Sequence, residues 1–163
     1  MLREEGDRKM RFQRGQSIVE FALVLPLFLL FTFSIIYFGC VFADYVTLGT
    51  IARSSARTAV VLQQEDAAKQ QDDYQKIREG FNDQKLPFDI YEWNPSDKHD
   101  FDIQYKSPTD SAPNGNVEVT VNAELQGFGK DLVRIVNGLS DSKIDGNLSI
   151  TYTMYSEYNW SKK

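Results

Sequence analysis

A run of 23 residues without a charged side chain, residues 21–43, constrains this chain more than any other feature. At a rise of about 1.5 Å per residue it would form a helix roughly 34 Å long, against a bilayer hydrocarbon core of about 30 Å. Fifteen of its residues are Leu, Ile, Val or Phe, and together they favour insertion by roughly 5–9 kcal/mol. The run therefore predicts one membrane-spanning helix, with the lipid bilayer as its partner.

Charged residues are distributed unevenly on the two sides of this run. Residues 1–15 carry five basic and three acidic side chains, whereas residues 44–163 carry 13 Lys and Arg against 19 Asp and Glu. Because basic flanks stay in the cytoplasm, we expect a single-pass protein of the cytoplasmic membrane with its N-terminus inside and its C-terminal part outside, periplasmic or extracellular. The acidic C-terminal part offers no electrostatic surface for nucleic acid, so no nucleic-acid partner is expected.

Two other interpretations of the run stay open. A removable secretory signal is cleaved after small residues, and Gly39, Cys40 and Ala43 supply some near the end of the run. A lipid-modified Cys40 is the second alternative, although Tyr37 and Phe38 make a poor match before it. We favour a membrane-spanning helix that is not removed, because the run is longer than the apolar core of a signal peptide. The single cysteine excludes an intrachain disulfide and a multi-cysteine zinc site.

Glu20 is the residue directly before the run. One interpretation is structural: an interfacial acid that extends towards Arg14 and the headgroups. The other depends on spacing, because a chain cut after Gly15 would carry a new α-amine on Gln16, four residues or one helical turn from Glu20. These opposite charges would neutralise each other in lipid, where an unpaired charge is expensive.

The string GQSIVEFALVLPLFLLF, residues 15–31, follows a basic segment and carries a family resemblance. A glycine followed by a glutamate five residues later resembles the type IV prepilin pattern. The full string resembles the TadE-type pseudopilins of the tight-adherence (Tad) pilus. The segment IARSSARTAV and, more weakly, VEVTVNAEL and SITYTMYSEYN are similar to later parts of that family. The resemblance is specific over residues 14–62, weaker over 117–159 and not visible over 64–116.

By that resemblance, Gly15 and Gln16 flank the bond that a membrane aspartyl prepilin peptidase cuts, and Glu20 is the assembly residue. The resemblance implies a minor pilin or pseudopilin that takes part in assembly of a Tad-type (type IVb/Flp) pilus and is incorporated into it. Its implied partners are other pilin and pseudopilin subunits, the prepilin peptidase and the Tad inner-membrane assembly platform. Phe21 departs from the tyrosine usual in the major pilins, and the long C-terminal part argues for a minor or accessory subunit.

The helical pattern continues beyond the run to about residue 63, so we expect one long helix over residues 16–63. Five small residues on it would permit the close approach of another helix; they are Gly49, Ala52, Ser55, Ala56 and Ala59. Arg53 and Arg57 lie one turn apart on a neighbouring flank. They are either solvated or paired with acids of an adjacent subunit or with anionic lipid.

Residues 64–163 predict an extracytoplasmic α+β head domain. We expect helices over residues 65–83 and 130–139, and strands or strand-like pieces over 88–93, 101–105, 117–124 and 148–158. SPTDSAPNGN, residues 107–116, predicts a turn-rich loop in which Asn114 and Gly115 suit a tight hairpin turn. The expected fold is thus α+β and type IV pilin-like. A basic leader (residues 1–15, cleaved) precedes the long helix (16–63) with its transmembrane segment (21–43), and a small antiparallel sheet with short helices follows (64–163).

The sequence contains little that is typical of an enzyme. His99 is the only histidine, and its polar surroundings indicate a solvated loop. Residues 141–147 resemble a calcium loop only faintly, because Lys143 occupies a ligand position. Asp97, Asp100 and Asp102 would bind calcium only if folding supplied further oxygens. We therefore expect no enzyme activity, no cofactor and no metal. The alternative function is an uncleaved single-pass anchor whose external domain binds a ligand or partner, or serves as an assembly chaperone.

Overall fold

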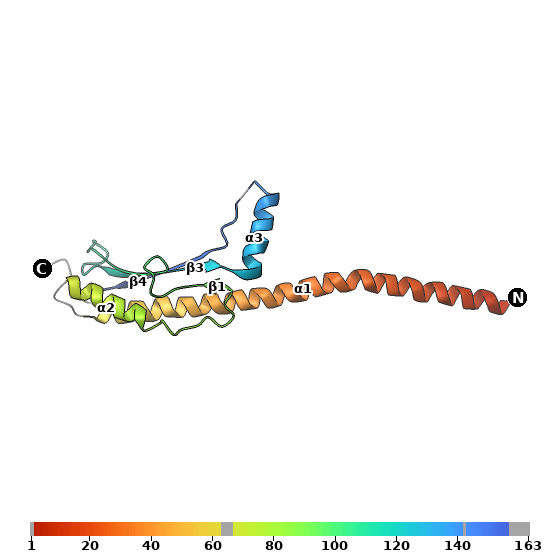
Figure 1. Ribbon diagram of the computed structural model, residues 1–163, viewed down its shortest axis with the longest axis horizontal. Helices are drawn as coiled ribbons and strands as arrows, with labels where there is room; N and C mark the ends of the chain where they lie inside the picture. The colour runs from red at the N-terminus through yellow and green to blue at the C-terminus, as the bar shows by residue number, and fades with distance from the viewer. Residues whose placement is uncertain (1, 63–66, 142, 157–163) are drawn as a thin grey trace. The chain divides into compact units, whose positions relative to one another are not determined.

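The computed structural model describes residues 2–62, 67–141 and 143–156, and within them the elements follow the order α1, α2, β1, β2, β3, α3, β4 (Figure 1). The chain divides into two compact units. The first ends at Gly39, and the second, which we call the C-terminal unit, begins at Cys40. The last 22 residues of α1 therefore belong to the same unit as the sheet. The expected division of the chain at residues 15 and 63 stays a prediction.

α1 (Leu2–Val61) is a single helix of 60 residues that continues through Pro26. It begins well before residue 16, where the prediction placed its start, because residues 2–14 are rich in good helix formers such as Leu, Arg, Glu, Lys, Met and Gln. The predicted end at residue 63 lies outside the described residues. The long N-terminal apolar helix of the predicted fold class is confirmed.

The segment Ser17–Val61 of α1 is long and apolar enough to cross a membrane, and none of its most apolar stretch is buried in the described structure. Apolar side chains are exposed around the whole helix here; Leu23, Phe33 and Ile35 are 74%, 63% and 72% exposed. A helix that is apolar on all sides and covered by no other element has the surface of a membrane anchor rather than that of a core helix.

β3 (Asn116–Leu125) is the centre of an antiparallel sheet. β4 (Leu148–Tyr155) pairs along one edge of it, and β2 (Phe101–Lys106) and β1 (Tyr91–Glu92) pair with successive parts of the other edge. All three pairings are antiparallel. The predicted α+β class with an antiparallel sheet is thus confirmed. The predicted last residue of the final strand, residue 158, lies outside the described residues.

The register of the sheet places one of its faces in the core. Val121 of β3 lies between Phe101 of β2 and Ile150 of β4. The alternation that predicted the central strand is confirmed: its buried residues are Val117, Val119, Val121 and Ala123, at most 2% exposed. The other face of β3 carries polar side chains; they are Glu118, Thr120, Asn122 and Glu124.

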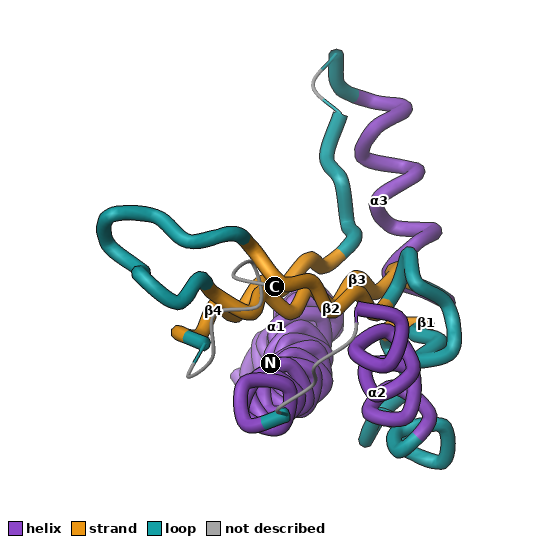
Figure 2. The backbone as a smooth tube through the Cα atoms, turned by 90° about the vertical axis from the view of Figure 1, so that its left-hand side faces the viewer, coloured by secondary structure: helices purple, strands orange, loops and turns teal. Residues whose placement is uncertain are grey.

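α1 and α2 (Ala67–Glu79) cover the buried face of the sheet (Figure 2). Tyr74 of α2 is 1% exposed, and its hydroxyl accepts a hydrogen bond from Gln70 Nε2 at 3.0 Å. Burial raises the pKa of Tyr74 above its usual value. The Phe101 ring packs against Phe81 and Trp93, with ring centroids 5.9 and 5.6 Å apart. α2 lies inside the range predicted for it, and residue 65 lies outside the described residues.

The link between β2 and β3 is the predicted turn-rich loop, but it lacks the tight two-residue turn expected at Asn114 and Gly115. Lys106 pairs with Asn116, so residues 107–115 form a long loop. A two-residue turn of the expected kind needs a positive φ at both positions, and of the pair only Gly115 has one, at 79°. A Cβ on Gly115 would collide with the Tyr105 hydroxyl and the Lys106 carbonyl oxygen. The turn prediction was therefore wrong, and the glycine is required by a close approach instead.

α3 (Gly127–Leu139) follows β3 almost directly and includes the helix predicted over residues 130–139. Val133 packs against the core. The Asn137 side chain binds the segment that returns to β4: its Oδ1 accepts from Ile144 N at 2.7 Å and its Nδ2 donates to Ile144 O at 2.9 Å. Most of its large apolar side chains nevertheless remain exposed.

Candidate functional site

The predicted cleavage and assembly residues lie on α1, in the unit that ends at Gly39. Gly15 and Gln16 have helical backbone, and the Glu20 side chain is exposed. Glu20 lies about 6 Å along the helix axis from Gln16, one turn away. Its neighbours Val19 and Phe21 are 66% and 65% exposed. The carboxylate of Glu20 therefore stands on a helix surface whose other side chains here are largely apolar.

Four of the five small residues predicted to pack against a helix are buried. Ala52, Ala56 and Ala59 are fully buried and Ser55 is 1% exposed. The three alanines share a core cluster with Val117, Val119 and Val121 of the sheet. The expectation named another helix as their partner, whereas the element that covers them is the sheet of the same chain.

Gly49 differs from the other four small residues. It is only half-buried, and a Cβ built on it would meet no atom within 4 Å. The close approach of another helix at Gly49 stays a prediction.

Arg53 and Arg57 are exposed, on the flank of α1 that the spacing predicted. The Arg53 guanidinium lies over the ring of Tyr152 in β4, 5.5 Å from the ring centroid. A cation in this position is attracted by the electron density of the ring face. Arg53 thus ties α1 to β4, and pairing of either arginine with a neighbouring subunit or with anionic lipid stays a prediction.

Asp44 is a residue whose role sequence reasoning missed. It is fully buried, and its carboxylate accepts hydrogen bonds from Phe88 N at 3.0 Å and from Ile90 N at 2.8 Å. It therefore holds residues 88–90 against α1 within the C-terminal unit. The spacing contained a signal, because Asp44 lies four and eleven residues before the buried Leu48 and Ser55, which puts it on the covered face of the helix.

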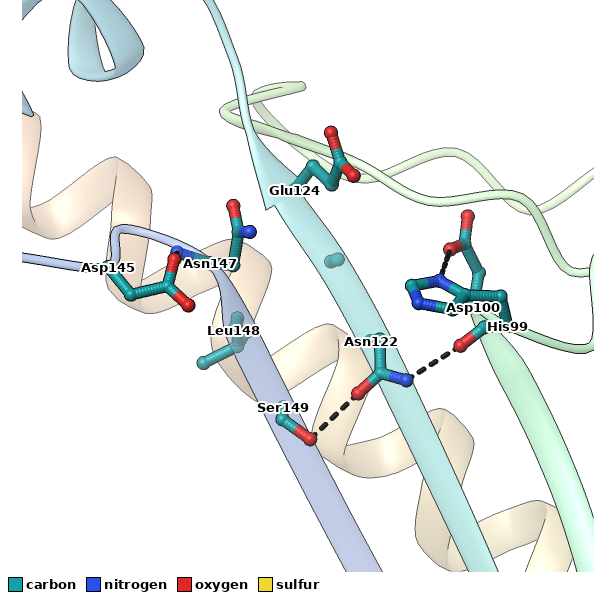
Figure 3. A pocket seen from close by; sticks show the side chains of 9 residues that line it. His99, Asp100, Asn122, Glu124, Asp145, Asn147, Leu148 and Ser149 are labelled. Atoms are coloured by element: carbon teal, nitrogen blue, oxygen red, sulfur yellow. Dashed lines mark hydrogen bonds and ion pairs between the residues drawn. The ribbon is translucent and has the colours of Figure 1, made fainter. Parts of the chain in front are cut away.

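A shallow pocket of about 260 Å³ lies on the polar side of the sheet (Figure 3). The Ser149 hydroxyl donates to Asn122 Oδ1 at 2.7 Å, and Asn122 Nδ2 donates to the His99 carbonyl oxygen at 2.6 Å. His99 Nδ1 lies 3.2 Å from Asp100 Oδ1 on a ring that is largely exposed. The Ser149 hydroxyl thus bonds to an amide rather than to the imidazole, which is not the arrangement of a nucleophile and its base.

Three of the acidic residues considered for calcium accept hydrogen bonds from backbone amides instead, and Asp102 accepts one from the Gln104 side chain. Asp97 Oδ1 accepts from His99 N at 2.9 Å, Asp100 Oδ2 accepts from Asn94 N at 3.0 Å, and Asp145 Oδ1 accepts from Asn147 N at 3.0 Å. Among the described residues, no group of three or more His, Cys, Asp and Glu side chains is placed to hold a metal ion. The expectations of no enzyme activity, no cofactor and no metal stay predictions.

Comparison with known proteins finds a family likeness in the N-terminal part of the chain. The family model described as TadE-like protein matches residues 15–57. The match begins at Gly15, includes Glu20 and the whole apolar run, and ends at Arg57, before the sheet. Neither a curated protein nor a solved structure matches the chain. The resemblance expected for residues 14–62 is thereby confirmed over nearly the same segment, and the weaker likeness of residues 117–159 stays a prediction.

Proposed function

We propose that this chain, TadE-like over residues 15–57, is a minor pilin or pseudopilin that takes part in assembly of a Tad-type (type IVb/Flp) pilus. The family match supports a pilus-related protein of the Tad system, and the long apolar helix supports a membrane anchor. In this proposal the N-terminus lies in the cytoplasm and the C-terminal unit lies outside. The partners are other pilin subunits, the prepilin peptidase and the inner-membrane assembly platform.

The observation that carries the proposal is the arrangement of features along α1. A single helix contains, in this order, the Gly15–Gln16 bond, the exposed Glu20, the uncovered apolar stretch and the small residues that pack against the sheet. A subunit assembled through its N-terminal helix needs this order, because one element must anchor the chain in lipid, pack in the fibre and bear the external domain.

Processing at Gly15 requires the helix to open locally, since a protease binds its substrate as extended chain. Glycine destabilises a helix interior by about 1 kcal/mol relative to alanine, and without a Cβ it lets the backbone lie close to catalytic groups. Cleavage would leave a cationic α-amine on Gln16, one turn from Glu20. In lipid an unpaired carboxylate costs about 3 kcal/mol at mid-membrane, so pairing of these two charges would favour one register between subunits.

The direct test is the N-terminus and intact mass of the protein purified from native membranes with and without an active prepilin peptidase. The expected result is an N-terminus at Gln16 that depends on the peptidase, and Gly15→Leu should abolish it. An intact N-terminus in the native host would contradict the pseudopilin proposal. A cut near Ala43 would instead identify a removable signal.

Glu20→Gln is expected to leave membrane insertion unchanged and to reduce incorporation into pili at least severalfold, because the neutral amide cannot neutralise the Gln16 amine. Glu20→Asp is the matched control: it keeps the charge, and we expect it to retain most incorporation. Both are measured as the ratio of pilus-bound to membrane-bound protein. Equal incorporation of Glu20→Gln and the wild type would remove the assembly role of Glu20.

A second candidate function is an uncleaved membrane anchor whose external domain binds a ligand or partner, or serves as an assembly chaperone. The observation that favours it is the end of the family match at Arg57, which leaves the strands and α3 without a counterpart in the match. The N-terminus measurement separates the two candidates, since only this second one requires residues 1–15 to remain.

A further inference from the structure

Three large apolar side chains of α3 form an exposed stripe. Leu132, Ile135 and Leu139 follow at intervals of three and four residues, so they share one face of the helix. They are 46%, 58% and 85% exposed. Val133 and Asn137, on the opposite face, make the contacts with the rest of the C-terminal unit.

Hydrogen bonds fix the start of α3 at the level of Asp44 on α1. Ile90 N donates to Asp44 Oδ2 at 2.8 Å, and Gln126 N donates to Ile90 O at 3.0 Å. The Gln126 side-chain amide also donates to Asp89 O at 2.9 Å, and α3 begins at the next residue, Gly127. Asp44 is the first charged residue after the apolar run. The first turn of α3 therefore lies at the depth at which α1 leaves the hydrocarbon.

α3 runs crosswise to the part of α1 in the same unit. In Figure 1 this part of α1 is horizontal and α3 stands upright, and Figure 2, turned by a right angle to look along α1, again shows α3 over its length. The apolar run ends within this unit, at Ala43, and a helix that leaves the hydrocarbon stands roughly along the bilayer normal, with a mean tilt of about 20°. Because α3 is crosswise to this end of α1, it lies parallel to the bilayer surface.

The stripe faces the end of the C-terminal unit at which α1 enters. A Cβ on Gly146 would lie 3.2 Å from Val133 Cγ2, and Asn137 binds the backbone of Ile144. Both contacts belong to the segment that returns to β4, and in Figure 1 this segment lies on the sheet side of α3. The opposite face of α3 is therefore turned towards the Cys40 end of α1, which is the membrane side.

Further residues at this level are typical of a membrane interface. Phe42, Tyr45 and Phe88 are 65%, 45% and 54% exposed, and Phe88 N donates to Asp44 Oδ1 at 3.0 Å. Aromatic side chains gather where headgroups meet the acyl chains. The polar side of α3 carries exposed Lys130 and Arg134, a combination found in helices that lie in the interface.

We propose that α3 is an interfacial helix that lies on the outer surface of the bilayer with its stripe of Leu132, Ile135 and Leu139 inserted among the lipid headgroups. The inference rests on the membrane anchor of the proposed function. Lipid fits the stripe better than a second copy of the chain does, because the stripe faces along the axis of α1, whereas a neighbouring subunit packed beside α1 would lie at its flank.

The test uses the full chain with Cys40→Ser, reconstituted in vesicles of phosphatidylcholine and phosphatidylglycerol and carrying one nitroxide on an introduced cysteine. Collision rates with oxygen, which enters lipid, and with a water-soluble nickel chelate are measured by power-saturation electron paramagnetic resonance. At Ile135→Cys the nickel collision rate is expected to be lower than at Thr151→Cys on the polar face of the sheet by about an order of magnitude, since interfacial helices bury their apolar face about 5–10 Å deep. Oxygen collisions should stay frequent at Ile135→Cys.

Lys130→Cys, on the polar side of α3, is the matched control and should collide with nickel as Thr151→Cys does. A third probe, Ile35→Cys in the spanning helix, separates the two proposals. Nickel collisions at Ile135→Cys as frequent as at Thr151→Cys, with Ile35→Cys in lipid, would overturn the interfacial helix alone. Nickel access at Ile35→Cys would overturn the anchor and the inference with it. Protection of Ile135→Cys from both reagents, with spin–spin broadening, would show a second copy on the stripe and overturn the assignment to lipid.

Discussion

Asp44→Ala is expected to lower the free energy of unfolding of the C-terminal unit by about 2–4 kcal/mol. A hydrogen bond to a charged group contributes about 1.5–3 kcal/mol, and the buried Asp44 carboxylate accepts two, from Phe88 N and Ile90 N. Phe88 is 54% exposed, so water can replace part of the hydrogen bond that its amide loses. The expected loss of unfolding free energy is therefore smaller than the contribution of two full hydrogen bonds.

Urea unfolding of the full chain in detergent micelles measures this loss. It is followed by tryptophan fluorescence in a Trp160→Phe background, where the remaining tryptophan is Trp93, which packs against Phe101. Hydrogen exchange gives the local result, because the amides of Phe88 and Ile90 should lose protection first. Asp44→Asn retains one acceptor oxygen and should lose less than Asp44→Ala. The matched control is Asp110→Ala, an exposed acid whose removal should change stability by no more than about 0.5 kcal/mol.

Unchanged protection of both amides in Asp44→Ala would contradict the role assigned to this carboxylate. The expected result also bears on the membrane proposal, since the path from α1 to α3 passes through Asp44, Ile90 and Gln126. Loss of Asp44 should therefore raise the nickel collision rate at Ile135→Cys even where the rest of the sheet stays folded.

Sequence patterns predicted which faces of the elements would be covered, because burial repeats with the period of a strand or a helix. The alternation of β3 is confirmed residue by residue. The small residues of α1 predicted a close approach as well, but a pattern of small side chains fits a sheet as readily as a second helix. The identity of the covering element depends on contacts between residues nearly 60 or more positions apart, which a local period does not contain.

The predictions that were wrong concerned short segments whose backbone N–H groups form hydrogen bonds to other parts of the chain. Residues 88–93 read as a strand, yet only Tyr91–Glu92 pairs with β3. Phe88 N and Ile90 N, which a longer strand would turn towards a neighbour, are bound by Asp44. A tertiary hydrogen bond of this kind overrides local β-propensity. Asn114 and Gly115 likewise suited a turn that the pairing of Lys106 with Asn116 excludes.

Among the candidate site residues, the spacing of Gly15, Gln16 and Glu20 was visible in the sequence because both the membrane helix and the family pattern are local along the chain. The exposure of α3 was not. Its amphipathic period predicts an apolar face, but a period cannot distinguish a face buried in the core from one left at the surface. That distinction required the register of β3 and the bond from Gln126 to Ile90.

Ala56→Leu is expected to lower the free energy of unfolding of the C-terminal unit by about 1–3 kcal/mol, because extra carbon atoms in a well-packed core force side chains and backbone to move. Ala56 is fully buried in the cluster that includes Val119 and Val121. Urea unfolding of monomeric protein in detergent isolates this effect from any contact between subunits. An unchanged midpoint together with reduced incorporation into pili would instead assign Ala56 to contact with another subunit.

Gly49→Ala is the matched substitution on the same helix, where a new Cβ meets no atom within 4 Å. Alanine favours a helix interior over glycine by about 0.5–1 kcal/mol, so the unfolding midpoint should stay or rise. If Gly49 packs against a neighbouring helix, the same change should lower pilus incorporation while stability is preserved, because small-residue contacts tolerate little added bulk. If Ala56→Leu lowers stability and Gly49→Ala lowers only pilus incorporation, then Ala56 belongs to the part of this face of α1 that packs against the sheet. Gly49 then belongs to the part that contacts another subunit.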